Sequence, residues 1–408
     1  MLNIVITGHI DHGKSTLIGR LLLETRSLPD GKLKELKKIS QDFGREAQIA
    51  YLADQLKEER ERNITIETTH IFLKTRRRPY CLIDTPGHVE FIKNMLTGAS
   101  HADCAVLLVD AQEGIREQTR RHAYLLRLLA IRHVIVLVNK MDLIDFSAEK
   151  FKAAATEISG LFQNLGATPP LIIPVAARDS ENISCASPRM PWHRGPCLLK
   201  ALDALPPPGT ASPKTPLRFP IQDVYRTGGE DIIVGQIVSG TLRRGQNVKL
   251  LPEDITATIR EIKCFGRKKT AAAATESIGL TLSSATRARR GQVIVPDPGA
   301  PQPVRRFQGN IFWLTQNPLC LNQVLTLRCT TQSIPCAVTQ IEKRIDPATL
   351  TVLDENAAEL QNNEAGIVHF NLHSPAVMEN FQDMPELGRY TIENNDTLLG
   401  AGTVLKKF

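Results

Sequence analysis

The chain has 408 residues, of which 42% are hydrophobic and 23% charged, a composition typical of globular proteins and not of disordered or fibrous ones. At about 150 residues per domain, this length predicts two or three domains. The formal net charge of +7 is modest for the size and does not by itself indicate a nucleic-acid partner. The longest apolar runs are far shorter than a membrane helix requires, so we expect no membrane association.

The cysteines and the N-terminal residues indicate the cellular compartment in which the protein is expected. The 8 cysteines include no CxxC pair, which favours free thiols over a disulfide framework or a zinc site. The first residues lack a basic segment followed by an apolar one, so we expect no export signal. Together these features predict a cytoplasmic protein.

The first half of the chain alternates between two hydrophobic patterns. Short runs of β-branched residues predict buried strands, and apolar residues at helical spacing predict helices between them. This alternation is typical of an α/β fold with a doubly wound parallel sheet. The strands are expected at 4–7, 80–84, 105–110, 134–139 and 171–175, and the helices at 15–23, 118–129 and 148–161.

Two proline-rich stretches, 206–216 and 296–303, then interrupt the chain. Proline fixes φ and lacks a backbone donor, so such stretches favour extended connectors. The segments after each stretch show short strands closed by glycine turns, which predicts two small β-barrels. We therefore expect domains at 1–208, 217–297 and 304–408.

A phosphate-binding loop follows the first predicted strand. Residues 8–16 read GHIDHGKST, which fits the pattern GxxxxGK[ST] between a strand and a helix. The backbone N–H groups of such a loop surround a phosphate at a helix N-terminus, the lysine bridges β- and γ-phosphates, and the following hydroxyl binds Mg²⁺. The predicted nucleotide-binding residues here are Gly8, His9, Asp11, His12, Gly13, Lys14, Ser15 and Thr16.

A second motif, DTPGH at 84–88, follows the strand predicted at 80–84. Asp84 can reach Mg²⁺ through water, and the Gly87 N–H can reach the γ-phosphate. A loop held in this way is released when that phosphate is lost. His88 is the candidate for orienting the attacking water.

The third motif, NKMD at 139–142, predicts the base. The Asp142 carboxylate can accept hydrogen bonds from N1–H and the exocyclic amino group of guanine, which adenine does not present. A buried polar group left unpaired can support discrimination of roughly 10⁴- to 10⁵-fold, so GTP and GDP are favoured over ATP. We expect Lys140 to lie along the base and Asn139 to connect this loop to the phosphate loop.

These motifs in this order resemble the translation-factor superfamily of GTPases. The run 59–66, ERERNITI, followed by DTPGH, carries the resemblance most specifically. It implies that Thr65 is a second Mg²⁺ ligand and that Ile10 and Ile64 form an apolar gate in front of His88. It also implies that Asp11 occupies a position able to hold a monovalent cation.

The similarity extends over essentially the whole chain and includes two branches of the superfamily. Residues 187–199, 216–225 and 399–404 are similar both to elongation factor Tu/1-alpha and to the large subunit of bacterial sulfate adenylyltransferase. Residues 17–22 and 118–124 favour the second branch. That branch implies a GTPase subunit that drives adenylyl sulfate formation from ATP and sulfate by a small catalytic partner subunit.

The alternative is an elongation-factor-like GTPase that delivers a tRNA-bound substrate to the ribosome. The histidines of the phosphate loop and the tract PIQDVY at 220–225 favour this branch. Basic clusters at 243–244, 267–269 and 287–290 could contact RNA backbone, or could simply be a solvated strand surface.

Two departures from the superfamily pattern affect the site. The loop that closes over the base has Ala176 where serine is usual, so a hydroxyl is missing there. The backbone N–H of Ala177 is then the candidate partner for guanine O6. Asn63 stands where glycine is frequent, next to the segment that contains Thr65.

Overall fold

The structure is a computed structural model that describes residues 1–9, 11–28, 69–84, 102–129, 131, 133–206, 215–227, 230–264, 267–283 and 287–408. The chain divides into two compact units, 1–206 with 347–350 and 207–346 with 351–408. Within the described residues, no helix combines the length and apolar character needed to cross a membrane.

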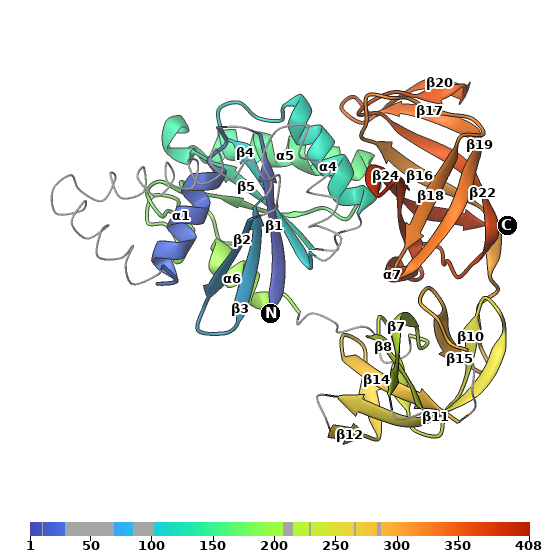
Figure 1. The fold of residues 1–408 in the computed structure, drawn as a ribbon. Coiled ribbons are helices and arrows are strands. Elements are labelled where there is room, and N and C mark those ends of the chain that lie inside the picture. Colours follow the sequence, from blue (N-terminus) through green and yellow to red (C-terminus); the bar gives the residue numbers. More distant parts are fainter. Residues whose placement is uncertain are drawn as a thin grey trace. The chain divides into compact units, whose positions relative to one another are not determined.

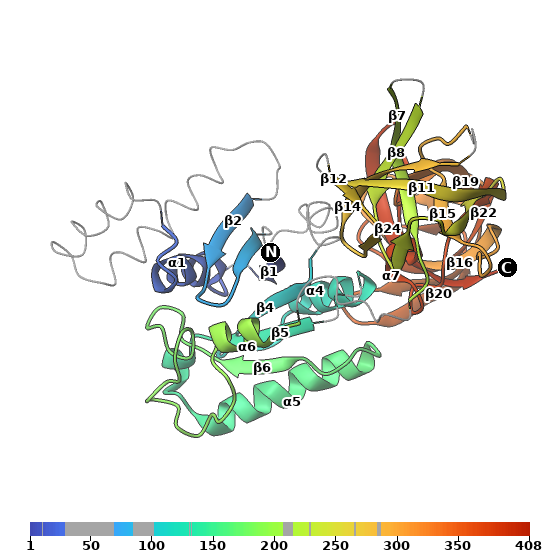
Figure 2. The ribbon, with the colours of Figure 1, turned by 90° about the horizontal axis from the view of Figure 1, so that it is seen from below.

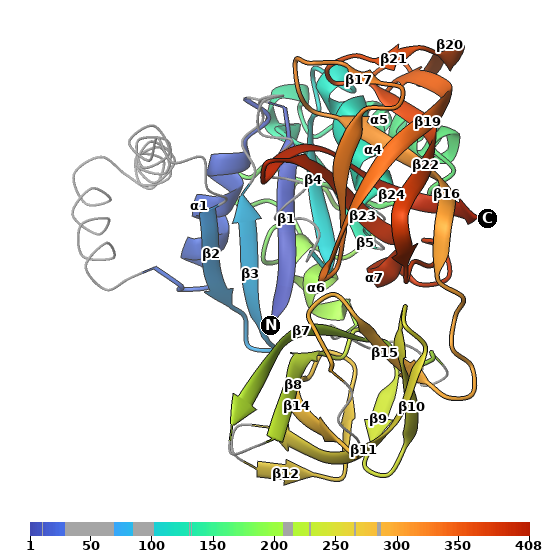
Figure 3. The ribbon, with the colours of Figure 1, turned by 45° about the vertical axis from the view of Figure 1, so that its right-hand side comes forward.

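The first unit is built on a six-stranded sheet in the order β2-β3-β1-β4-β5-β6 (β1 to β5 are labelled in Figures 1 and 3, β6 in Figure 2). β1, β3, β4, β5 and β6 are parallel neighbours, and β2 pairs antiparallel with β3 at the edge. The strands are β1 Leu2–Gly8, β2 Thr69–Lys74, β3 Pro79–Asp84, β4 Cys104–Asp110, β5 His133–Asn139 and β6 Leu171–Pro174. The predicted parallel sheet is confirmed, while β2 was not expected.

Helices cover both faces of this sheet. They are α1 Lys14–Glu24, α4 Glu117–Leu128, α5 Ala148–Asn164 and α6 Leu198–Ala204, with a short 3₁₀ helix η2 at Met141–Ile144. α1 and α6 share one apolar core with Ile4 and Leu137. α4 packs on α5, β1 and β4 (Figure 2). Since strand side chains alternate between faces, the nearly continuous apolar strands are what a sheet buried on both sides requires.

The second unit contains two closed barrels. The first runs β10-β15-β7-β8-β14-β11 and closes because β10 also pairs with β11; the second runs β18-β23-β24-β16-β22-β19 and closes through β18 and β19. β12 and β20 extend these sheets at one edge each. Closure satisfies the backbone groups that an open edge would expose. The α/β fold with two β-barrels is therefore confirmed.

The barrel strands have the following bounds. The first barrel and its additions comprise β7 Phe219–Thr227, β8 Glu230–Gln236, β9 Thr241–Arg243, β10 Asn247–Leu251, β11 Ile255–Cys264, β12 Arg267–Lys269, β13 Ala271–Ala273, β14 Ser277–Leu282 and β15 Val293–Pro296. The second comprises β16 Val304–Trp313, β17 Leu319–Cys320, β18 Val324–Cys329, β19 Gln332–Asp346, β20 Thr351–Ala357, β21 Glu359–Leu360, β22 Ala365–Ala376, α7 Pro385–Gly388, β23 Arg389–Asn394 and β24 Thr397–Lys407. The exact domain limits stay a prediction.

Candidate nucleotide-binding site

The sheet register brings the predicted motifs to one edge. Ile6 of β1 is level with Asp84 of β3, and Asp110 of β4 is level with Asn139 of β5. Since these strands are parallel, their carboxyl ends face the same way, where ligands bind in open α/β sheets. The phosphate loop, Asp84 and the NKMD loop therefore lie along one edge of the sheet.

The phosphate loop needs both of its glycines. Gly8 has φ of 148° and Gly13 has φ of 92°. A Cβ on Gly8 would lie 2.7 Å from the Leu108 carbonyl oxygen, and one on Gly13 would lie 2.5 Å from Asn139 Nδ2. Side chains at either position would push the loop away from β4 or from the NKMD loop.

The N-terminus of α1 points its donors into this loop. The N-cap of α1 is Gly13, which has no side chain to cap the helix, and Lys14 and Ser15 are both buried. The first N–H groups of a helix have no partner within it, so they and the helix dipole favour an anion. Lys14 Nζ donates to the Gly8 and His9 carbonyl oxygens at 2.6 and 2.8 Å, which holds its charge inside the loop.

The residues present suit a magnesium ion bound together with a nucleotide. Asp84 ends β3 with a buried carboxylate, and Ser15 offers a hydroxyl at the same edge. Oxygen donors of this kind are what Mg²⁺ prefers, and it usually keeps phosphate and water ligands as well. In the described part of the chain, no group of three or more His, Cys, Asp or Glu side chains could hold a metal by itself.

Asn139 connects three loops. Its Nδ2 donates to the His12 carbonyl oxygen at 2.9 Å, and its Oδ1 accepts from the Ala177 N–H at 3.0 Å. The Asn139 side chain therefore links the phosphate loop, the NKMD loop and the base-closing loop by hydrogen bonds. The sequence interpretation assigned the Ala177 N–H to guanine O6, whereas here Asn139 takes this donor, so an O6 contact would have to share it.

The same base-closing loop is also held by α1. Arg20 Nε donates to the Ala177 carbonyl oxygen at 3.2 Å, and its Nη2 donates to the Arg178 carbonyl. Ala176 and Ala177 are both buried. These backbone contacts hold the loop in place independently of a side chain at position 176.

Asp142 and Lys140 occupy different surroundings in the NKMD loop. Asp142 is half-buried in the first turn of η2, and Lys140 has a positive φ of 62°. The Lys140 ammonium pairs with Asp110 Oδ2 at 2.8 Å. Burial raises the pKa of Asp110, but Lys140 and the N–H groups of Gln112 and Glu113 outweigh it, so that pKa lies below its ordinary value.

Several residues behind the phosphate loop were missed by the sequence interpretation. Asp110 is the last residue of the buried strand β4, a signal that could have identified it. His122, Gln118 and Glu113 belong to α4 or the loop before it and contact Thr7, His9 and His12 respectively. Their partners are about a hundred residues away in the sequence, so local spacing could not reveal them.

Some predicted site residues lie outside the described residues, namely Ile10, Ile64, Thr65, Gly87 and His88. Asp11 is described: it is exposed and has φ of 67°. The proposed roles of all six stay predictions.

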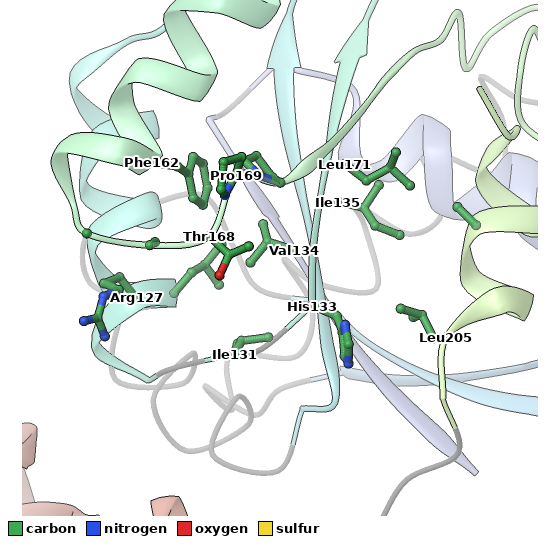
Figure 4. A pocket seen from close by; sticks show the side chains of 15 residues that line it. Arg127, Ile131, His133, Val134, Ile135, Phe162, Thr168, Pro169, Leu171 and Leu205 are labelled. Carbon is green, nitrogen blue, oxygen red and sulfur yellow. The ribbon is translucent and has the colours of Figure 1, made fainter. Parts of the chain in front are cut away.

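A pocket of about 390 Å³ opens at the opposite edge of the sheet (Figure 4). His133 and Leu171, which begin β5 and β6, belong to its lining. Apolar side chains dominate it, with Arg127, His133 and Thr168 as polar groups. Because it lies at the amino ends of the strands, it is separate from the nucleotide loops.

A glycine-bounded loop at the uncapped start of α1, joined through Asn139 to an NKMD loop, defines a P-loop nucleotide-binding protein of the GTPase class. Residues 1–241 match the family model described as elongation factor Tu GTP binding domain, and residues 306–405 match GTP-eEF1A C-terminal domain-like. The chain belongs to the elongation factor Tu/1-alpha family of translation-factor GTPases.

Two relatives named elongation factor 1-alpha agree with this assignment. Elongation factor 1-alpha of Archaeoglobus fulgidus is 37% identical over 99% of this chain and 97% of its own length. The same-named protein of Pyrococcus furiosus is 36% identical, again over 99% and 97%. A solved structure of sup35 complexed with GMPPNP covers 100% of this chain and 94% of its own, with 23% identity and a TM-score of 0.48.

The assignment to the sulfate adenylyltransferase branch was wrong. Relatives matched over nearly the full length are named elongation factor 1-alpha, so the findings favour the alternative. The expected small catalytic subunit has no support. The physical reason is that the motifs used to choose the branch lie on the GTPase core, which both branches need for the same nucleotide chemistry.

Proposed function

We propose that this protein is an elongation-factor GTPase that delivers a tRNA-bound substrate to the ribosome. The observation that carries the proposal is the match to elongation factor 1-alpha over 99% of the chain, which includes both barrels as well as the GTPase core. A GTPase core alone would serve many functions. This role places the protein in the cytoplasm.

In this proposal, the phosphate loop and α1 bind the nucleotide. Lys14 contacts the β- and γ-phosphates, while Ser15, Asp84 and Thr65 hold Mg²⁺. When bound, Mg²⁺ would supply positive charge next to the phosphates. Asp142 recognises guanine, and Asn139 keeps the base loop aligned with the phosphate loop.

Hydrolysis would depend on His88, which orients water behind the gate formed by Ile10 and Ile64. Replacing His88 with alanine should slow GTP turnover by about 10²-fold or more while GTP affinity stays within a few-fold. Loss of GTP binding in that variant would assign His88 a structural role.

The surface of the first barrel bears on RNA binding. Lys268 pairs with Glu261 at 2.6 Å, and Lys269 and Arg289 pair with Glu276 and Glu253. Basic side chains in such ion pairs are less available to bind the phosphates of an RNA backbone. Among the described residues, the exposed side chains of Arg243, Arg267 and Arg287 have no such partner, so we propose that these three contact RNA backbone.

The test is a binding titration with aminoacylated tRNA. We expect complex formation with GTP and magnesium, at least tenfold weaker binding with GDP, and a steep loss of affinity as salt rises. Arg267→Ala should lower the magnitude of the slope of log affinity against log salt by about one. Lys268→Ala should lower it less, because the Lys268 ammonium is already paired with Glu261. Equal binding with GTP and GDP, or none, would contradict the proposal.

A further inference from the structure

Two polar side chains of α4 contact the place where β1 enters the phosphate loop. The His122 ring places Nδ1 against Thr7 Oγ1, and Gln118 Oε1 lies 2.5 Å from His9 Nδ1. Four residues of helix advance about 6 Å and two residues of strand about 6.6 Å. The spacing of 118 and 122 on α4 therefore matches that of 7 and 9, and α4 contacts both the end of β1 and the first part of the phosphate loop.

The inner contact is closed to water. Thr7 has 0% and His122 has 6% of its surface exposed. In the part of the chain that the structure describes, Thr7 is the only hydrogen-bond partner of the His122 ring. Burial first, and then the nearby Lys14, His9 and His12, lower the pKa of His122 to about 3, so the ring is neutral near pH 7.

The Thr7–His122 contact is connected to Lys14, the lysine expected to bind the phosphates, through one residue. Thr7 is followed by Gly8, whose carbonyl oxygen accepts from Lys14 Nζ at 2.6 Å. A shift of Thr7 along or across the sheet would turn that carbonyl and move the ammonium with it. Gly8 cannot compensate by moving toward β4, because it already approaches the Leu108 carbonyl too closely for a Cβ.

We propose that Thr7 and His122 form a positioning pair that sets the geometry of the phosphate loop and thereby the affinity for the phosphates of the nucleotide. Neither side chain needs to touch the nucleotide. The proposal rests on nucleotide binding by this loop and not on the proposed delivery of tRNA. A displacement of about 1 Å in a preorganised site can cost two orders of magnitude.

The first variant is Thr7→Val, which preserves the side-chain shape and removes the hydroxyl. We expect the dissociation constants for GDP and GTP, measured by calorimetry, to rise at least tenfold. In GTP turnover, kcat/KM should fall by a similar factor, because the displaced loop and its lysine bind the phosphates less tightly. Affinity within twofold of the unmodified protein would overturn the proposal.

A second variant separates positioning from mere stability. Thr7→Val combined with His122→Phe removes both polar partners, a change that can leave stability nearly unaltered. We expect the melting temperature to recover relative to Thr7→Val while nucleotide affinity stays low. Recovery of affinity together with stability would mean that the pair is only structural, and would overturn the proposal.

Two further variants complete the test. Thr281→Val in β14 makes the same substitution at another buried threonine, 1% exposed, and should leave nucleotide affinity unchanged. Thr7→Ser should restore affinity to within threefold. If Thr7→Val is insoluble, Thr7→Cys replaces the hydroxyl with a weakly bonding thiol, and we expect a severalfold loss of affinity. Unchanged affinity in Thr7→Cys would then overturn the proposal.

Discussion

The ammonium of Lys140 pairs with Asp110 Oδ2 at 2.8 Å, across the neighbouring ends of β5 and β4. Only 3% of the Asp110 side chain is exposed, against 31% for Lys140. Asp110 Oδ1 also accepts the backbone N–H groups of Gln112 and Glu113 at 2.7 and 3.3 Å. The lysine head is therefore held at the sheet edge, and its methylene stem is the part available to cover a base.

Asp110→Asn should weaken this arrangement. We expect a loss of about 1–3 kcal/mol in the free energy of unfolding of the first unit and a weaker affinity for GDP, since a buried acceptor for Lys140 loses its charge. Guanidinium unfolding and calorimetry would measure the two effects. If they arise from one ion pair, the effects of Asp110→Asn and Lys140→Met should be strongly non-additive. Additive effects would show that the residues act separately.

Asp142→Asn should change the preferred base. An amide presents a donor where guanine needs an acceptor, so GTP affinity should fall by several orders of magnitude while affinity for xanthosine triphosphate rises. Competition between the two nucleotides would measure this preference. Asp145→Asn, at an exposed position just after η2, is the matched control and should change neither affinity. An unchanged preference in Asp142→Asn would refute the base contact.

Glu379→Gln should destabilise the second unit. Glu379 accepts from Arg218 Nη2 at 2.7 Å and from Lys407 Nζ at 2.9 Å, and Arg218 and Glu379 are only 5% and 13% exposed. Breaking a buried pair costs about 3–5 kcal/mol. The variant Asp231→Asn breaks the exposed pair with Arg226 and should cost under about 1 kcal/mol. Equal losses in the two variants would contradict this assignment.

The contribution of Glu379 should also depend on pH. Burial raises its pKa, but Arg218 and Lys407 lower it more, so the folded pKa lies below the ordinary value. The stabilisation is therefore present above the unfolded pKa of about 4.5 and disappears as pH falls through the folded value. The difference in stability between the unmodified protein and Glu379→Gln should shrink accordingly below about pH 4.

His122 predicts a pH dependence of the same sign in the first unit, at higher pH. Its folded pKa of about 3 lies below the unfolded value of about 6.5, so the unfolded chain binds an extra proton between these values. Stability should rise with pH through this window, by up to about 1.4 kcal/mol per pH unit, and level off above about pH 6.5. His12, whose pKa burial also lowers, should add in the same direction.

The measurement compares unfolding of the unmodified protein and His122→Gln at pH 5 and pH 7.5. The chain has 2 tryptophans, Trp192 in the first unit and Trp313 in the second. A Trp313→Phe background therefore leaves Trp192 as the fluorescence reporter for the unit that contains His122. The His122→Gln variant should show the shallower dependence on pH. Parallel slopes would mean that another group takes up the proton.

The site residues were predicted from local signals. The phosphate loop and the NKMD loop each span fewer than ten residues between a strand and a helix, so their spacing alone specifies which chemical groups meet a phosphate or a base. The antiparallel strand β2 was missed because its short run of alternating residues, Thr69–Lys74, carries little information about its partner.

The choice between two branches of the superfamily was wrong for a related reason. The residues that favoured sulfate activation, 17–22 and 118–124, belong to α1 and α4, which support the phosphate loop. They report on nucleotide binding, which both branches share. A comparison over the full chain also includes the barrel sequences. The shared nucleotide chemistry does not require the two branches to be similar there.

Local patterns in the amino-acid sequence were enough to specify the alternating strands and helices, the barrels and the nucleotide, because hydrophobic periodicity and loop chemistry act over a few neighbouring residues. Packing alone established that Thr7 meets His122, that Asn139 joins His12 to Ala177, and that Arg218 meets Glu379. Most of these partners are more than a hundred residues apart, and they meet only once the sheet register and barrel closure are complete.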